Sequence, residues 1–454
     1  METKHVTIER ASAMPAATWH FLNMNDAQVE VPEGLSIAPA VQVSEPWAAQ
    51  GAADEFENAL ADAQAEWEES HPAPTAEELA EREAYVAAEA DATYGGTAQS
   101  AYQIAADAIE ESRSLAVAFE HGTGDETAAY LRYAAGDRIV VAAKEGQSVD
   151  AQVVVSAVPG AVSAAAVDVI ADANSAVNLS IVVNEYQDVP AAHFAGNEQQ
   201  ERPDTHSGIT GTTVRVFADE GARVEIDRTQ AIDGDFTDID DMGLFTAENA
   251  QVTVRQTVLG AASSFTGLAG DLRGDSSRID VDTRYLGHGD QQRDFNYSLR
   301  HHGAKTKCNL QANGVLAGTS SKTLRGTIDL IRGCKGAEGS ENETVLLVDE
   351  GVHNKTVPVI LCNEDDVAGN HGATIGHIRE EQLFYLASRG LSQQAAESMF
   401  ASAIVEQAAI DATTDAARES VIRYGERLTP GFADLFENEH HPVDDVHFSP
   451  NTTL

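Results

Sequence analysis

Between residues 353 and 377 the sequence gathers its densest group of soft or borderline metal ligands. The group consists of His353, Cys362, His371 and His377. Imidazole and thiolate ligands favour iron, iron–sulfur clusters and zinc. The spacing matches no closed zinc site. Cys362 also ends the apolar run 357–362, where a thiol can serve as a small buried hydrophobe, so both interpretations of that cysteine stay open.

The usual sequence signatures of catalysis are missing. No Lys residue follows a Gly, so the chain has no P-loop of its own. The sequence also lacks a His-Glu-x-x-His zinc helix, a Gly-x-Ser-x-Gly nucleophile turn and a Cys-x-x-Cys pair. Residues 233–241 hold five carboxylates without the order of an EF-hand loop. In so acidic a chain this segment predicts a solvated loop rather than a Ca²⁺ site.

A short repeat in the middle of the chain indicates which elements position these residues. A small residue followed by alternating apolar residues recurs every 27 to 29 residues, starting at Ala222, Ala250, Ser277 and Thr306. Repeats of this length are typical of solenoids, because one unit buries its apolar face only against a neighbour. No amphipathic helix separates the copies, so a parallel β-helix fits better than a helical array. An antiparallel sandwich is the alternative.

The three cysteines follow nearly the same interval. Cys308, Cys334 and Cys362 are separated by 26 and 28 residues. This spacing predicts thiols on successive coils near one column, although Cys334 lies in a Gly-containing corner sequence. Three cysteines cannot form a disulfide framework, and they suit a reducing compartment.

Helical patterns flank the repeat on both sides. Residues 54–91 hold 13 acidic side chains and predict a surface helix, and residues 98–118 predict a second helix. Residues 380–389 predict a helix capped by Gly390, followed by a helix that Ser392 caps. We expect a mostly helical N-terminal region over 1–127, a β-helix core over 128–376, a helical domain over 377–436 and a flexible tail over 437–454.

The composition limits the habitat and the partners. The 454 residues include 73 Asp and Glu against 29 Lys and Arg, a formal net charge of −44. Phosphates would be repelled, which disfavours nucleic-acid binding. A surface rich in carboxylates is expected of a cytoplasmic protein in a salt-adapted, halophilic organism. The start of the chain has no apolar signal core and Pro159-Gly160 interrupts the most apolar stretch, so we expect neither secretion nor a membrane span.

The C-terminal third carries a recognisable pattern. Residues 369–376 read Gly-Asn-His-Gly-Ala-Thr-Ile-Gly, and residues 381–392 continue the pattern. His302-Gly303, Arg325-Gly326 and the segment 355–358 fit its upstream parts. This pattern resembles the SufB/SufD family of iron–sulfur cluster assembly scaffolds. The resemblance covers residues from about 290 to 410 and extends back to about 130.

The resemblance implies a fold and a set of partners. The fold would be a right-handed parallel β-helix flanked by helical domains, in agreement with the repeat. The chain would be a non-catalytic scaffold subunit that assembles with a SufB-like subunit, or with a second copy of itself, and with the SufC ATPase. ATP hydrolysis would reside in that partner, and this chain would bind no nucleotide.

The C-terminal helices are where the resemblance places the ATPase. Four consecutive apolar residues on a helix cannot all face one core, so part of the run stays available to a partner. The expected contact residues are Leu383, Phe384, Tyr385, Leu386 and Arg389. Burial between the terminal helices is the alternative for these side chains.

Details of the pattern favour the SufD-like branch. SufB-like chains have a cysteine where we align Val352 and a Glu where Gly372 stands. SufD-like chains keep the His-Gly-Ala-Thr motif, which residues 371–374 match. Some of them have a cysteine two residues before the motif, where this chain has Gly369.

His371 is therefore the main ligand that the resemblance implies. It would contribute to a transient iron–sulfur cluster at a subunit interface, with Cys362 and His353 as further candidate ligands. A turn histidine that ends the β-helix is the structural alternative, since Gly372 permits an unusual backbone conformation there.

Two other functions stay open. One is a β-helix enzyme that acts on polysaccharide, although aromatic residues make up only 6% of the chain and sugar-binding faces usually need rings. The other is a homodimeric SufB-like scaffold.

Overall fold

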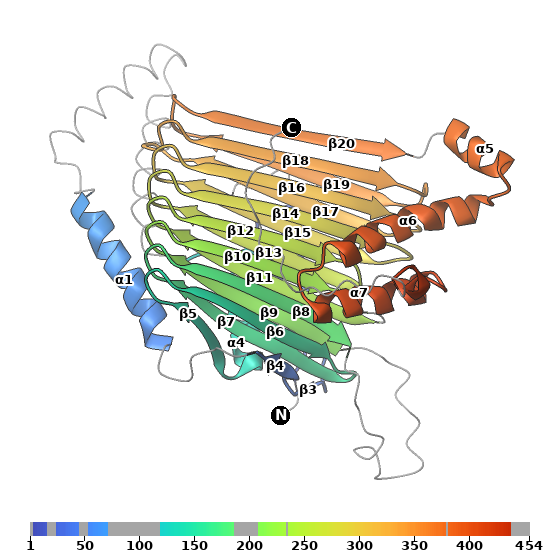
Figure 1. Cartoon of the computed structure of the whole chain (residues 1–454), viewed down its shortest axis with the longest axis horizontal. Helices are drawn as coiled ribbons and strands as arrows, with labels where there is room; N and C mark the ends of the chain where they lie inside the picture. Colours follow the sequence, from blue (N-terminus) through green and yellow to red (C-terminus); the bar gives the residue numbers. More distant parts are fainter. Residues whose placement is uncertain are drawn as a thin grey trace, which may run out of the picture.

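The computed structural model describes residues 3–15, 24–44, 53–70, 119–185, 208–232, 235–377 and 380–436. The chain builds a mainly β solenoid from two nine-stranded sheets (Figure 1). Successive strands alternate between the sheets, so that even-numbered strands form one sheet and odd-numbered strands the other. We call them the even sheet and the odd sheet.

The even sheet consists of β4 (Val41–Val43), β6 (Ser148–Ala157), β8 (Ala176–Glu185), β10 (Arg223–Gln230), β12 (Gln251–Val258), β14 (Arg278–Gly287), β16 (Lys307–Leu316), β18 (Glu338–Leu347) and β20 (Ala368–His377). The odd sheet consists of β3 (Ser36–Ile37), β5 (Arg138–Ala143), β7 (Ala161–Ala171), β9 (Gly208–Ala218), β11 (Phe236–Thr246), β13 (Ser263–Leu272), β15 (Gln292–His301), β17 (Ser321–Leu330) and β19 (His353–Cys362). Within these two sheets all pairings are parallel except that of β4 with β6.

The repeat correctly predicted the register of the even sheet. Val224, Val252, Ile279 and Cys308 are successive partners across β10, β12, β14 and β16. Their side chains are buried in one column. This parallel pairing rules out the antiparallel sandwich.

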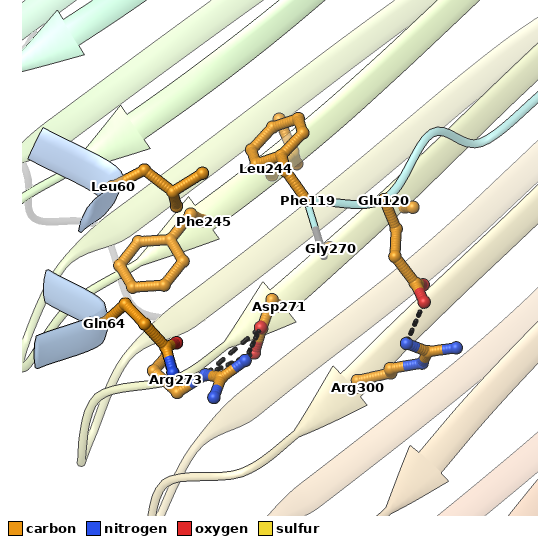
Figure 2. A pocket seen from close by; sticks show the side chains of 11 residues that line it. Leu60, Gln64, Phe119, Glu120, Leu244, Phe245, Gly270, Asp271, Arg273 and Arg300 are labelled. Carbon is orange, nitrogen blue, oxygen red and sulfur yellow. Dashed lines mark hydrogen bonds and ion pairs between the residues drawn. The ribbon is translucent and has the colours of Figure 1, made fainter. Parts of the chain in front are cut away.

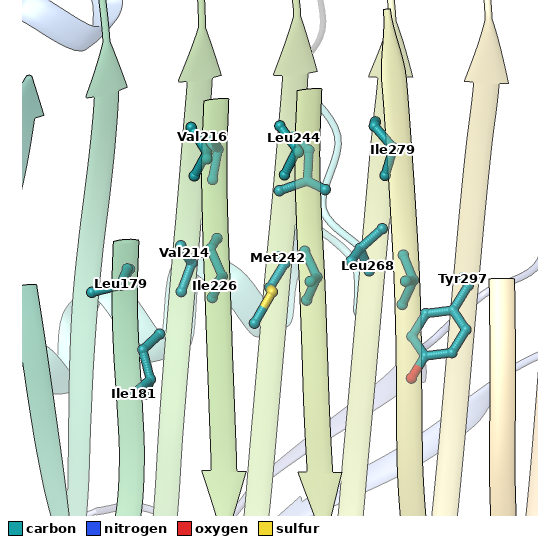
Figure 3. Close-up of a cluster of buried hydrophobic side chains, with 14 of the residues drawn as sticks. Leu179, Ile181, Val214, Val216, Ile226, Met242, Leu244, Leu268, Ile279 and Tyr297 are labelled. Carbon is teal, nitrogen blue, oxygen red and sulfur yellow. The ribbon is translucent and has the colours of Figure 1, made fainter. Parts of the chain in front are cut away.

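The core lies between the two sheets. Figure 3 shows Val216, Leu244 and Leu268 of the odd sheet meeting Leu179, Ile226 and Ile279 of the even sheet. Full burial of such a side chain contributes about 1.5–3 kcal/mol. Because every coil repeats the same inward positions, the interior forms continuous columns that lead to the last coil.

The described part of the N-terminal region contains strands as well as helices. Its described residues include four strands: β3, β4, and the antiparallel pair β1 (Val6–Ala11) and β2 (Ala27–Val31). Helix α1 (Ala53–Ser70) agrees with the acidic helical pattern, whereas α4 (Asp125–Ala135) was not predicted. The expected helix over 98–118 and the tail over 437–454 lie outside the described residues.

The C-terminal helices follow the sequence prediction closely. Helix α5 (Glu380–Ser388) ends just before Gly390, whose φ of 87° is the left-handed conformation of a C-terminal cap. Helix α6 (Gln393–Ile410) starts directly after Ser392. Helix α7 (Asp415–Leu428) and a 3₁₀ turn (Ala433–Leu435) complete the chain's described part.

Helices α6 and α7 pack on one end of the even-sheet strands (Figure 1). Val405 of α6 and Val421 of α7 share a buried cluster with Leu259 and Leu286. The Tyr424 hydroxyl donates a 2.7 Å hydrogen bond to the Leu259 carbonyl oxygen. No helix in the described part of the chain is both long and apolar enough to cross a membrane.

Candidate functional site

The last coil of the solenoid is an open end. Among the described residues, strands β19 and β20 each have a neighbouring strand on one side only. Nine of the ten residues of β20 are exposed, and the remaining one, Gly376, is half-buried. Burial alternates along the neighbouring strand β18 instead. An edge strand of this kind presents unpaired backbone N–H and C=O groups, so it is ready to pair with another chain.

His371 lies on this edge strand, at the mouth of the solenoid interior. Its register partner on β18 is Glu341, which in turn pairs with Leu310 of β16. Leu310 and Glu341 are both buried, at 3% and 4% exposure. Since partners in a parallel ladder share one face of the sheet, His371 continues an inward-facing column, and it is exposed because no coil covers it.

The carboxyl group of Glu341, the register partner of His371, is buried and incompletely hydrogen-bonded. Glu341 Oε2 has no hydrogen-bond partner in the structure. Burial raises the pKa of Glu341 to about 7, and repulsion from Glu343 adds to the shift while Lys322 opposes it. This glutamate therefore holds a proton much more readily than an exposed one.

Glu343, two residues further along β18, has a full set of partners. Tyr285 donates a 2.8 Å hydrogen bond to its Oε1. The Lys322 ammonium forms an ion pair with the same carboxylate, and Lys322 also donates to Thr356 Oγ1 at 3.0 Å. Glu343 therefore closes a buried polar network, whereas Glu341 does not.

In the part of the chain that it describes, the structure does not gather the other candidate ligands with His371 into a group of three or more. His353 starts β19, and its register partner Ser321 precedes the inward-facing Lys322, so His353 faces outward. Cys362 ends β19 and is exposed, so it is not a buried hydrophobe. Among the described residues, no three His, Cys, Asp or Glu side chains gather closely enough to hold a metal ion.

The predicted cysteine column is wrong. Cys308 lies on β16 of the even sheet, Cys362 ends β19 of the odd sheet, and Cys334 lies in the turn between β17 and β18. The matching intervals arose because each coil has a similar length, not because the thiols occupy equivalent positions.

Cys308 takes part in a buried contact with a histidine. His301 Nε2 lies 3.1 Å from Cys308 Sγ, and its Nδ1 lies 2.7 Å from Thr306 Oγ1. Burial lowers the pKa of His301 to about 4 and raises that of Cys308 to about 12. Both groups are therefore neutral near pH 7, so the thiol is a hydrogen-bond donor rather than an activated nucleophile.

Sequence reasoning missed a polar network deep in the solenoid. The acidic segment predicted as a solvated loop includes Asp238, Asp240 and Asp241, which are fully buried on β11. Arg228 of β10 donates to Asp238 at 2.8 Å, and Gln256 donates to Asp240 at 2.8 Å. Burial raises the pKa of Asp240 to about 6 even though Arg228 opposes the shift.

The prediction failed because it counted charge and ignored alternation. Asp238 and Asp240 are two residues apart, the spacing of one strand face. Arg228 lies two residues after Ile226, so it continues the inward face of β10. Alternation of Asp238 and Asp240 with Ile239, together with an Arg on the inward face of the preceding strand, was the available signal.

A small pocket lies between α1 and the odd sheet, where Leu60 of α1 faces Phe245 of β11 (Figure 2). Its charged groups pair with one another, Glu120 with Arg300 and Asp271 with Arg273. Because these charges largely cancel, the pocket lacks the field of one sign that would attract a charged ligand.

Helix α5 extends beyond the end of β20 (Figure 1). It carries exposed aromatic rings. Phe384 is 77% and Tyr385 56% exposed. Leu386 is half-buried, and the Arg389 guanidinium lies 5.3 Å from the Tyr385 ring centroid. The side chain of Leu383 lies outside the described part. An exposed pair of large rings is typical of a protein-binding surface.

Comparison with known proteins relates this architecture to one family. Residues 190–404 match the family described as SUF system FeS cluster assembly, SufBD core domain. The matched segment is just under half of the chain. It includes most of the solenoid, the open end with His371, and the start of the C-terminal helices.

Individual SufBD proteins are similar over parts of the chain. An iron–sulfur cluster assembly protein SufD of Bacillus subtilis is 30% identical over 129 residues, 28% of this chain and 30% of the relative. The SufD protein of Escherichia coli is 27% identical over 191 residues, 41% and 45% of the two chains. A SufBD family protein of Synechocystis is 30% identical over 161 residues, 35% and 33%. In each comparison the chain spans less than half of the relative's length.

Proposed function

We propose that this chain is a SufD-like scaffold subunit of an iron–sulfur cluster assembly system. The observation that carries the proposal is the uncovered last coil, whose edge strand β20 bears His371 within the segment that matches the SufBD core domain. The chain supplies a rigid solenoid and an accessible imidazole. It performs no catalysis of its own in this proposal, and it acts in the cytoplasm.

The open end is the proposed contact with a second SufBD-type chain. That chain is a SufB-like subunit, and a second copy of this chain is the alternative. Exposed strand edges on both partners can pair through their backbone groups, which the described part of this chain leaves unpaired on the outer side of β20. His371 then lies at the subunit interface, where it shares a transient cluster with ligands from the partner.

The exposed rings of α5 form the proposed contact with a SufC-type ATPase. This contact accounts for Phe384 and Tyr385, which pack against no buried cluster of the described residues. Nucleotide binding and hydrolysis take place in that ATPase, and the coupling requires an interface with two alternative states.

Anaerobic reconstitution of the complex tests the role of His371. We expect His371→Ala, co-expressed with SufB-type and SufC-type partners, to reduce bound iron and sulfide several-fold without changing the subunit composition. His353→Ala is the matched control, because His353 is also exposed on an edge strand but faces outward. Equal iron and sulfide contents in His371→Ala and wild type would remove the role of the imidazole.

A further inference from the structure

Of the two inward-facing glutamates of β18, Glu341 is the one with an unpaired carboxyl oxygen. The residue is 4% exposed, and its Oε2 has no hydrogen-bond partner among the described residues. A buried polar group without a partner costs about 1–3 kcal/mol, and more when it is charged. Glu343, on the same face two residues later, is fully paired. The cost at Glu341 is therefore specific to one residue.

The opposite sheet leaves room for this carboxylate. A Cβ atom on Gly326 of β17 would lie 2.3 Å from Glu341 Oε1 and 2.5 Å from Oε2. No other residue type would fit without displacing the carboxyl group. The carboxylate thus lies across the interior of the second-last coil, between Gly326 and the column that ends at His371.

Further acceptor oxygens without partners lie in the same part of the interior. Asn354 of β19 pairs in register with the inward-facing Lys322, and its Oδ1 is buried and has no hydrogen-bond partner. Two carboxylates, Glu341 and Glu343, face the single Lys322 ammonium. The described groups at this end therefore include one carboxyl group more than Lys322 can pair, together with unpaired acceptor oxygens on Glu341 and Asn354, a combination that favours a cation.

We infer that Glu341 and His371 together bind a divalent transition-metal cation at the open end of the solenoid. The inference rests on the proposed function. It adds Glu341 as a second ligand from this chain, and it identifies the bound species as a metal ion. A carboxylate and an imidazole are ligands that suit ferrous iron and its neighbours. Two protein ligands leave other coordination positions of the ion unfilled, so water or a partner chain completes the coordination.

Cobalt(II) binding to the full-length chain tests the inference, because Co²⁺ is stable in air and its visible absorption reports nitrogen and oxygen ligands. We expect the wild-type chain to bind one Co²⁺, and Glu341→Gln and His371→Ala each to weaken binding about tenfold or more. Glu338→Gln is the matched control. Glu338 lies on the same strand but outward, in an exposed ion pair with Lys307, so this variant should bind Co²⁺ like the wild type.

Each variant is first checked by thermal unfolding, so that a loss of folding is distinguished from the loss of a ligand. Glu341→Gln keeps the shape of the side chain and removes a buried charge without a partner, so we expect its melting temperature to equal or exceed that of the wild type. Wild-type Co²⁺ affinity in a folded Glu341→Gln chain would overturn the inference.

The outcome is separable from that of the proposed function. If Glu341→Gln binds Co²⁺ normally while His371→Ala impairs cluster assembly in the complex, the inference fails and the scaffold function stands. If Co²⁺ binding needs both side chains but the chain never assembles with SufBD-type or ATPase partners, the inference stands and the scaffold function fails.

Discussion

His301 shows how the solenoid interior treats a titratable side chain. Its ring is fully buried between Cys308 and Thr306. The Thr306 hydroxyl donates to the Gly303 carbonyl oxygen at 3.0 Å, so its oxygen can accept the Nδ1 proton. Nε2 then accepts the Cys308 thiol proton. This chain of hydrogen bonds fixes the corner between β15 and β16, and it requires a neutral imidazole.

The neutral state of His301 predicts a pH-dependent stability. Desolvation lowers its pKa from 6.5 to about 4 in the folded state, so the unfolded state binds a proton first as the pH falls. Stability is present above pH 6.5 and is lost between pH 6.5 and 4. From pH 7 to 5 we expect a loss of about 2 kcal/mol from this residue.

Urea unfolding at both pH values, compared with His301→Gln, isolates that contribution from the other titrating groups. The glutamine variant should be less stable at pH 7, and its unfolding free energy should fall by about 2 kcal/mol less than that of the wild type on going to pH 5. Parallel pH dependence of the two proteins would show that His301 is not buried in neutral form.

At the scale of elements, α5 differs from the other C-terminal helices in the exposure of its large side chains. Helices α6 and α7 bury Val405 and Val421 against the even sheet, whereas α5 exposes Phe384 and Tyr385. Replacing both rings with Ser therefore removes little buried area, so we expect the stability of the solenoid to change by less than about 1 kcal/mol.

The same double substitution should abolish co-purification with a SufC-type ATPase, because exposed aromatic side chains carry much of the energy of such interfaces. Met399→Ser provides the control, since Met399 is a large exposed apolar residue of α6, at 51% exposure. Retention of the ATPase by the double variant, measured by pull-down, would place the docking surface elsewhere.

The observed helices and strands also show which parts of the fold could be predicted from the sequence. Alternating apolar residues at a constant interval predicted the parallel register of β10 to β16, because stacking requires equivalent positions to share one column. Helix α4 was missed. Its residues 125–135 pack on the odd sheet through Leu131, a tertiary contact that the local pattern does not contain.

The motif indicated His371, and the structure places this residue on an exposed edge strand. Its role as a ligand stays a prediction. Glu341 was not predicted, because its importance depends on Gly326 of another strand and on the register of β18 with β20. Long-range register of this kind follows from the number of residues in each turn, which the repeat alone does not specify at the last coil.

For the whole molecule, the outer face of the odd sheet and the last coil differ in their cover. Strands β1 and β2 and helix α4 share a buried cluster with outward-facing residues of β7, β9, β11 and β13. Strand β20 has no such cover among the described residues, and nine of its ten residues are exposed. The last coil is therefore the part of the solenoid that is available to a specific partner.

The backbone of β20 allows a test of strand pairing with a partner that leaves the fold of this chain intact. The Ala368 N–H donates to the Ala337 carbonyl oxygen of the β18 side at 2.9 Å. Since donors along a strand alternate in direction, the N–H of Ala373 points away from β18, toward the free edge. Ala373→Pro therefore removes a donor that the chain itself does not use, as proline does on natural edge strands.

We expect Ala373→Pro to retain the wild-type melting temperature within a few degrees, and to weaken association with a SufB-type partner at least about tenfold, the effect of losing about 1.4 kcal/mol. Thr374→Pro is the contrasting variant, because its N–H points toward β18 and its loss should destabilise the last coil itself. Sedimentation equilibrium of the mixed chains measures the association. A folded Ala373→Pro chain that associates as tightly as the wild type would mean that the partner does not extend the even sheet through β20.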